Sequence, residues 1–212
     1  VEGALISKYR NSGQTCVCTN RILVQESIHG AFVAKLVAAT ADLKMGNGLE
    51  DGVQQGPLVN AGAVQDVEQL VQLSVEAGAQ VAVGGARSEL GPCYYQPTVL
   101  TAVTPDMAVF RHEIFGPVAP VLSFIDEGEA ISLANDTEFG LASYFYTRDI
   151  GRVWRVSEAL DYGMVGVNEG IISNEMAPFG GVKASGSGRE GSKYGIDDYL
   201  EIKYILMGGL DR

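Results

Sequence analysis

The strongest constraint on the fold of this chain is the alternation of short apolar segments with segments of helical periodicity. Valines recur at positions 64, 67, 71 and 75, the spacing of one helix face. Apolar strand-like segments are expected at 21–25, 80–83, 97–103, 118–125, 141–146 and 163–167. Parallel strands need crossover connections, which are usually helical. The pattern therefore predicts an α/β fold of three layers, a mostly parallel sheet flanked by helices.

The sequence also predicts four further helices and a C-terminal strand. Further helices are expected at 4–12, 27–43, 127–135 and 149–160, the second of them capped by Ser27. Apolar and charged residues alternate along Tyr199–Leu206, which predicts a final strand able to pair with an edge of this domain or with another chain. We expect one α/β domain over 1–198, followed by a C-terminal oligomerisation strand and tail over 199–212.

Charge and composition exclude several classes of protein. The 212 residues carry 15 Lys and Arg against 26 Asp and Glu, a net charge of −11. Nucleic acids and anionic membranes attract basic surfaces, so neither is an expected partner. A secreted disulfide scaffold needs more cysteines and usually an even number, whereas this chain has three. The cysteine count therefore favours a reducing, cytoplasmic location. Two distant histidines give no ligand pair, so no metal site is expected.

Cys16 and Cys18 are the first candidates for chemistry. Cys16 follows a glycine in a polar loop between a helix-like and a strand-like stretch, where α/β folds place reactive residues. It is therefore a candidate nucleophile, against the alternative of a small buried side chain. Cys18 is close enough in sequence to form only a strained, easily reduced disulfide with Cys16. Cys18 is thus either the redox partner of a switch or an unreacted neighbour.

Two further motifs are ambiguous by themselves. Gly186–Gly191 matches G-x-G-x-x-G, but loop sequence precedes it, so we interpret it as a tightly turning connection. Glu113 lies two residues before Phe115 and just ahead of a Gly-Pro turn. It is either a solvated turn residue or a carboxylate beside an aromatic ring, suited to recognising hydroxyl groups.

Four segments together resemble the aldehyde dehydrogenases, in the order and at roughly the spacing of that family. They are Gly13–Cys16, Glu113–Pro117, Asn135–Leu141 and Pro178–Gly181. The tail over 186–204 looks most like that of succinate-semialdehyde dehydrogenases. The resemblance covers nearly the whole chain.

The resemblance implies a role for each candidate residue. Cys16 is the implied nucleophile, giving a thiohemiacetal and, after hydride transfer to NAD or NADP, a thioester that water hydrolyses. Glu113 is implied to bind the nicotinamide ribose hydroxyls, and Phe115 to pack near the nicotinamide. Arg10 and Ser173 match positions that hold the distal carboxylate of a small aldehyde such as succinate semialdehyde. A homo-oligomer is expected.

The sequence also departs from the family pattern. The family's cofactor domain, its general-base Glu, the Asn of its oxyanion hole and a second substrate-binding Arg belong to a segment that would precede Val1. We therefore expect this chain alone to bind no cofactor and to be inactive as a dehydrogenase. Two alternatives remain: a non-catalytic oligomerisation or interaction module, and a thiol-redox protein that uses Cys16 and Cys18.

Overall fold

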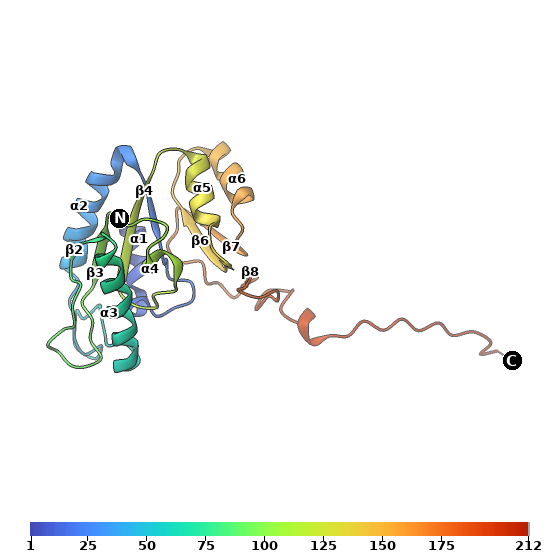
Figure 1. The fold of residues 1–212 in the computed structure, drawn as a ribbon. Helices are drawn as coiled ribbons and strands as arrows, with labels where there is room; N and C mark the ends of the chain where they lie inside the picture. Colours follow the sequence, from blue (N-terminus) through green and yellow to red (C-terminus); the bar gives the residue numbers. More distant parts are fainter. Residues whose placement is uncertain (212) are drawn as a thin grey trace.

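The central sheet is the frame of the molecule. A computed structural model describes residues 1–211 (Figure 1). Its four strands are ordered β1 (Ile22–Gln25), β4 (Val118–Phe124), β3 (Thr98–Thr101) and β2 (Gln80–Val83). β4 pairs in parallel with both β1 and β3, and β2 joins the edge in antiparallel orientation. The expected mostly parallel sheet is confirmed.

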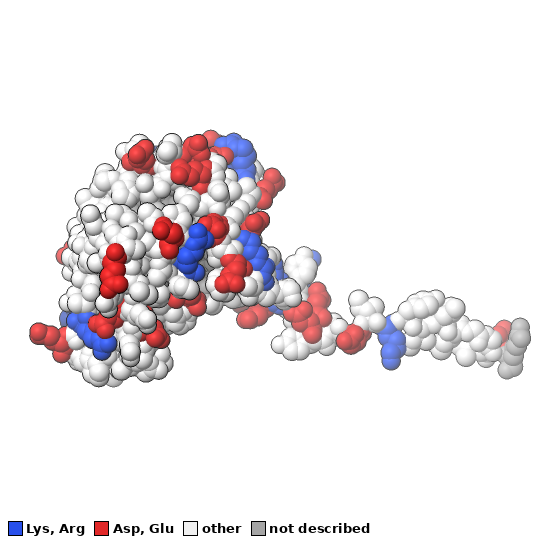
Figure 2. All heavy atoms as spheres, viewed as in Figure 1, with Lys and Arg blue, Asp and Glu red and all other residues white. Residues whose placement is uncertain are grey.

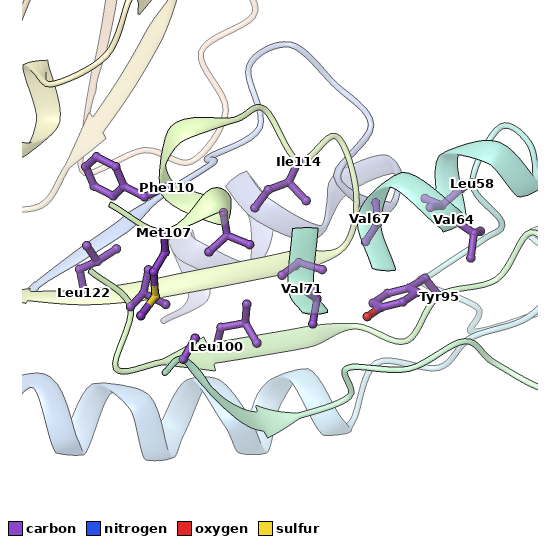
Figure 3. Packing of buried hydrophobic residues seen from close by; sticks show 14 residues of the cluster. Leu58, Val64, Val67, Val71, Tyr95, Leu100, Met107, Phe110, Ile114 and Leu122 are labelled. Carbon is purple, nitrogen blue, oxygen red and sulfur yellow. The ribbon is translucent and has the colours of Figure 1, made fainter. Parts of the chain in front are cut away.

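Helices cover both faces of this sheet. On one face lie α1 (Glu2–Tyr9) and α2 (Glu26–Ala41), and on the other α3 (Ala61–Glu76) and α4 (Ala108–Arg111). The remaining helices, α5 (Glu127–Asn135) and α6 (Ile150–Ala159), follow later in the chain. Side chains of β4 alternate between two buried clusters because successive strand residues point to opposite faces. Ala119 and Val121 pack with α1 and α2, whereas Val118 and Leu122 pack with α3 and α4 (Figure 3). The three expected layers are therefore present.

A smaller part of the fold follows the main sheet in the chain. β6 (Ala142–Phe145) and β7 (Met164–Val167) form a parallel pair beside α5 and α6 (Figure 1). β5 (Phe139–Gly140) and β8 (Val182–Lys183) form a short antiparallel pair. On the face drawn in Figure 2, Lys and Arg side chains are scattered among Asp and Glu and form no basic patch.

Three local expectations need correction. Ser27 does not cap α2, because β1 runs directly into the helix and Gln25 occupies the N-cap position. The first helix ends at Tyr9 instead of residue 12, because Asn11 and Ser12 adopt left-handed backbone angles. The short elements α4, β5 and β8 were not expected from the sequence.

The C-terminal segment leaves the domain as an extended chain (Figure 1). After a 3-10 turn at Asp197–Tyr199, residues 200–209 form no strand in the single chain. The large apolar side chains there are exposed: Tyr199, Leu200, Ile202, Tyr204, Ile205, Leu206 and Met207. Pairing of Tyr199–Leu206 with another chain remains a prediction, and position 212 of the predicted tail lies outside the described residues. No helix among residues 1–211 is long and apolar enough to cross a bilayer.

Candidate functional site

The loop that presents Cys16 starts with an unusual backbone. Asn11, Ser12 and Gly13 follow α1 with φ angles of 51°, 55° and 77°. A non-glycine residue in the left-handed region costs of order 1 kcal/mol or more, and such residues cluster at functional sites. Asn11 and Ser12 carry this cost and keep their conformation only where the surroundings hold them in place, whereas Gly13 adopts its angle without strain.

A second loop, 56–59, supplies the contacts that hold this backbone. The Ser12 hydroxyl donates to the carbonyl of Gly56 at 3.0 Å. The Gln14 side chain donates to the carbonyl of Pro57 at 3.3 Å and accepts from the N–H of Val59 at 2.8 Å. The position of the Cys16 loop thus depends on hydrogen bonds to residues more than forty positions away.

Cys16 is exposed on this loop, and Cys18 is half-buried beside it. Both thiols are free. The Cys18 sulfur lies 3.0 Å from the hydroxyl of Thr15 and 3.5 Å from the carbonyl oxygen of Arg10. The sequence placed Cys16 in a polar loop and left open whether its side chain is buried, and in the structure it is exposed.

Tyr144 on β6 anchors the loop immediately after the nucleophile. Its hydroxyl donates to the carbonyl of Val17 at 2.8 Å. Burial raises the pKa of Tyr144 to about 12, against an opposing effect of Arg10, so the hydroxyl remains a donor through the neutral range. Sequence reasoning missed this contact because the two residues are 127 positions apart.

Lys8 is a second residue that sequence reasoning missed. Its side chain is 1% exposed, and burial lowers the pKa of its ammonium group to about 8. Electrostatic interactions with Cys18 and Glu113 act in the opposite direction and raise the pKa of Lys8. The signal was present in the sequence: Lys8 lies one helical turn after Ala4 and Leu5, which pack against the core of that face.

The Glu113–Pro117 turn packs directly against the Cys16 loop. A Cβ atom added to Gly13 would lie 2.1 Å from the carbonyl oxygen of Gly116, so only glycine permits this approach. Glu113 is exposed, and the Phe115 ring is 44% exposed on a backbone with φ of 47°. The predicted nucleophile and the predicted cofactor-binding residues therefore belong to two touching loops.

The two predicted substrate-binding residues lie in different segments. Arg10 is half-buried at the C-terminal end of α1, six residues before Cys16. Ser173 is exposed in the loop after β7. That loop packs on α1, since a Cβ on Gly170 would lie 2.7 Å from the carbonyl oxygen of Gly3. Within residues 1–211, no hydrogen bond joins the Ser173 hydroxyl to the Arg10 side chain.

The glycine-rich motif at Gly186–Gly191 does not form the strand–turn–helix of a dinucleotide-binding fold. Gly186 and Gly191 have φ of 101° and 63°, and the segment doubles back so that Phe179 pairs with Glu190. No helix begins within it, which agrees with the interpretation as a turning connection. Among residues 1–211, no group of three or more His, Cys, Asp or Glu side chains could hold a metal ion.

The layered α/β fold thus presents an exposed cysteine on a strained loop that touches the Glu113–Pro117 turn. The chain belongs to the aldehyde dehydrogenase family, whose model matches residues 1–205. Its structure superposes on the crystal structure of succinate-semialdehyde dehydrogenase from Burkholderia pseudomallei with a TM-score of 0.94, at 60% identity, over 96% of this chain and 42% of that chain.

Three curated relatives are similar to this chain over nearly its whole length. The chain is 60% identical to 3-sulfolactaldehyde dehydrogenase of Pseudomonas putida, covering 100% of this chain and 44% of that protein. It is 61% identical to glutarate-semialdehyde dehydrogenase of Pseudomonas aeruginosa over 99% of this chain and 44% of that protein. It is 57% identical to the NADP(+) succinate-semialdehyde dehydrogenase of Escherichia coli over 98% of this chain and 43% of that protein. The chain thus spans less than half the length of these relatives.

Proposed function

We propose that residues 1–198 form the catalytic domain of an NAD(P)-dependent semialdehyde dehydrogenase in which Cys16 is the nucleophile. The observation that carries this proposal is the exposure of Cys16 on a strained loop that touches the Glu113–Pro117 turn. Exposed sulfur on a rigidly held backbone suits a group that must meet a substrate carbonyl in one orientation.

The chemistry begins with the Cys16 sulfur. As a thiolate it attacks the aldehyde carbon, and the carbonyl π electrons move to oxygen, giving a thiohemiacetal anion. The backbone N–H of Cys16 supports that oxyanion. The hydride leaves the same carbon as the C=O bond re-forms, and NAD or NADP, when bound, would be its acceptor. The thioester on Cys16 is then cleaved by water, releasing the acid and the thiol.

Glu113 and Phe115 fit the nicotinamide end of such a cofactor. The Glu113 carboxylate is exposed and can accept hydrogen bonds from both ribose hydroxyls. The exposed Phe115 ring offers an apolar face next to it. Both lie on the turn that touches the Cys16 loop, so they would hold a cofactor on the side of the site where Cys16 lies.

We propose a small aldehyde with a distal carboxylate as the substrate, succinate semialdehyde being the leading candidate. Arg10 can grip a carboxylate through two parallel hydrogen bonds, and the Ser173 hydroxyl can add a third. The relatives named above act, by their names, on 3-sulfolactaldehyde, glutarate semialdehyde and succinate semialdehyde. The test is Arg10→Gln in the longest source-cell polypeptide that contains these residues. We expect a KM for succinate semialdehyde raised at least tenfold, with no comparable change for an uncharged aldehyde.

We further propose that this activity requires a cofactor domain outside the 212 residues, so that the isolated chain has no dehydrogenase turnover. The general base for thioester hydrolysis is likewise expected outside this segment. NAD(P)H production by the 212-residue chain at a rate near that of the longer polypeptide would refute this. We also propose a cytoplasmic location, because three cysteines are too few for a secreted disulfide scaffold.

The exposed tail favours a second role, in assembly. The large apolar side chains of Tyr199–Leu206 are exposed in the part of the chain that the structure describes. We propose that this segment pairs with another copy of the chain, as a strand or packed against its surface. Truncation after residue 198 should convert oligomers to monomers in light scattering, and unchanged mass would reject the role.

Cys18 remains a proposed redox partner of Cys16. In the thiol state, Cys18 contacts Thr15 and the carbonyl of Arg10. Peroxide treatment should join the two sulfurs in a disulfide, with loss of two hydrogen atoms from the peptide that contains both cysteines and reduction of the peroxide to water, and a reductant should reverse the change. Without that mass change, the switch and the thiol-redox alternative both fail.

A further inference from the structure

The Asn20 side chain brackets Glu113. Asn20 lies four residues after Cys16 and two before β1. Its Nδ2 donates to the carbonyl oxygen of His112 at 2.9 Å. Its Oδ1 accepts from the N–H of Ile114 at 2.9 Å. One amide group thus pairs with the peptide groups on both sides of Glu113, as a neighbouring strand would.

The start of this turn is also held by the N–H of His112, which donates to the carbonyl oxygen of Ala108 at 3.0 Å. The turn over 112–115 belongs to no strand, and Phe115 follows in the left-handed region. Within residues 1–211, the side-chain hydrogen bonds to the backbone of His112 and Ile114 come from Asn20. The Ile114 side chain is buried in the core, whereas Glu113 is exposed. Asn20 and the buried Ile114 together therefore set the direction in which Glu113 leaves the turn.

We propose that Asn20 is a positioning residue for the cofactor: it holds Glu113 where its carboxylate meets the nicotinamide ribose, and it ties that carboxylate to the nucleophile loop. The inference rests on the proposed function and adds a residue to it. The pairing needs one donor and one acceptor in the plane of a single group, which an amide provides. A carboxylate in the same place offers acceptors alone and would face the His112 carbonyl oxygen unfavourably.

Two substitutions separate this role from general stability. In the longest natural polypeptide containing these residues, Asn20→Leu removes both hydrogen bonds at similar volume, and Asn20→Asp removes the donor. Hydrogen bonds to a charged group are strong enough that misplacing Glu113 should weaken NAD(P) binding about tenfold. We expect that rise in the Kd from direct nucleotide titration and in the KM for the nucleotide, with kcat and the aldehyde KM changed by less than about threefold. Asn47→Leu, in an exposed loop away from the site, is the matched control.

A double-mutant cycle tests the route of the effect. If Asn20 acts through Glu113, then Asn20→Leu adds nothing to the loss caused by Glu113→Ala. Acylation of Cys16 by p-nitrophenyl acetate, which needs no nucleotide, should proceed at the unsubstituted rate in every Asn20 variant.

Three results would overturn the inference: additive losses in the cycle, unchanged nucleotide affinity in Asn20→Leu, or loss of Cys16 acylation together with affinity, which would indicate collapse of the loop. Failure of the unsubstituted polypeptide to bind NAD or NADP would instead reject the proposed function itself, and the positioning role with it.

Discussion

Burial of Lys8 predicts a specific dependence of stability on pH. Its pKa is about 8 in the fold and 10.5 ordinarily, burial being the largest cause. Between those values the unfolded chain binds a proton that the folded chain does not, so stability rises with pH across this window. The difference of 2.5 units, at 1.36 kcal/mol each, means that the buried ammonium costs about 3 kcal/mol at pH 7.

Lys8→Met removes this cost. At pH 7 we expect the substitution to increase the free energy of unfolding by about 3 kcal/mol, apart from any pH-independent change in packing. The gain should shrink as pH rises from about 8 to 10.5, because Lys8 in the unsubstituted fold then loses its charge. Urea denaturation at half-unit steps from pH 6.5 to 10.5 measures it.

Lys35→Met is the control, since Lys35 is an exposed lysine on α2. Its unfolding curve should parallel that of the unsubstituted chain at every pH. A Lys8→Met difference that is constant from pH 7 to 10.5 would contradict the expected cost of burying the ammonium group. It would mean that the Lys8 ammonium reaches solvent or a strong partner in solution.

Two further predictions concern the loop around the nucleophile. Tyr144→Phe deletes the hydrogen bond to Val17 and should lower the free energy of unfolding, measured by urea denaturation, by about 1 kcal/mol. The same substitution should slow the labelling of Cys16 by iodoacetamide. An unchanged labelling rate would mean that Tyr144 does not anchor the loop. Gly13→Ala places a Cβ against the Gly116 carbonyl at positive φ and should cost more than about 2 kcal/mol, whereas Gly30→Ala, in open space on α2, should stabilise by about 0.5 kcal/mol. Equal effects of the two alanines in urea denaturation would contradict the close approach.

Local patterns were sufficient for most of the fold. The helix expected at 127–135 and the strand expected at 80–83 form with the expected bounds, because periodicity and turn residues act over a few positions. β5 and β8 are two residues each and exist through a partner more than forty positions away. No local signal could have found them.

The features of the candidate site also fall into those that local sequence motifs reveal and those that depend on contacts across the fold. Cys16 and the Glu113 turn were recognisable as motifs, and the structure brings their loops into contact at Gly13 and Gly116. The left-handed backbone at Asn11 and the Asn20 bracket arise from contacts across the fold, which sequence spacing does not encode. Lys8 shows a third case: its helical position pointed inward, but a charged side chain is ordinarily expected to be solvated.

The role of Cys16 as the nucleophile is best tested by the rate of NAD(P)H formation from succinate semialdehyde in the longest natural polypeptide that contains these residues. We expect turnover in that polypeptide and none above background in its Cys16→Ala variant. Cys93→Ala, a half-buried cysteine outside the site, should leave the rate unchanged. Turnover that survives Cys16→Ala would contradict the assignment of Cys16 as the nucleophile.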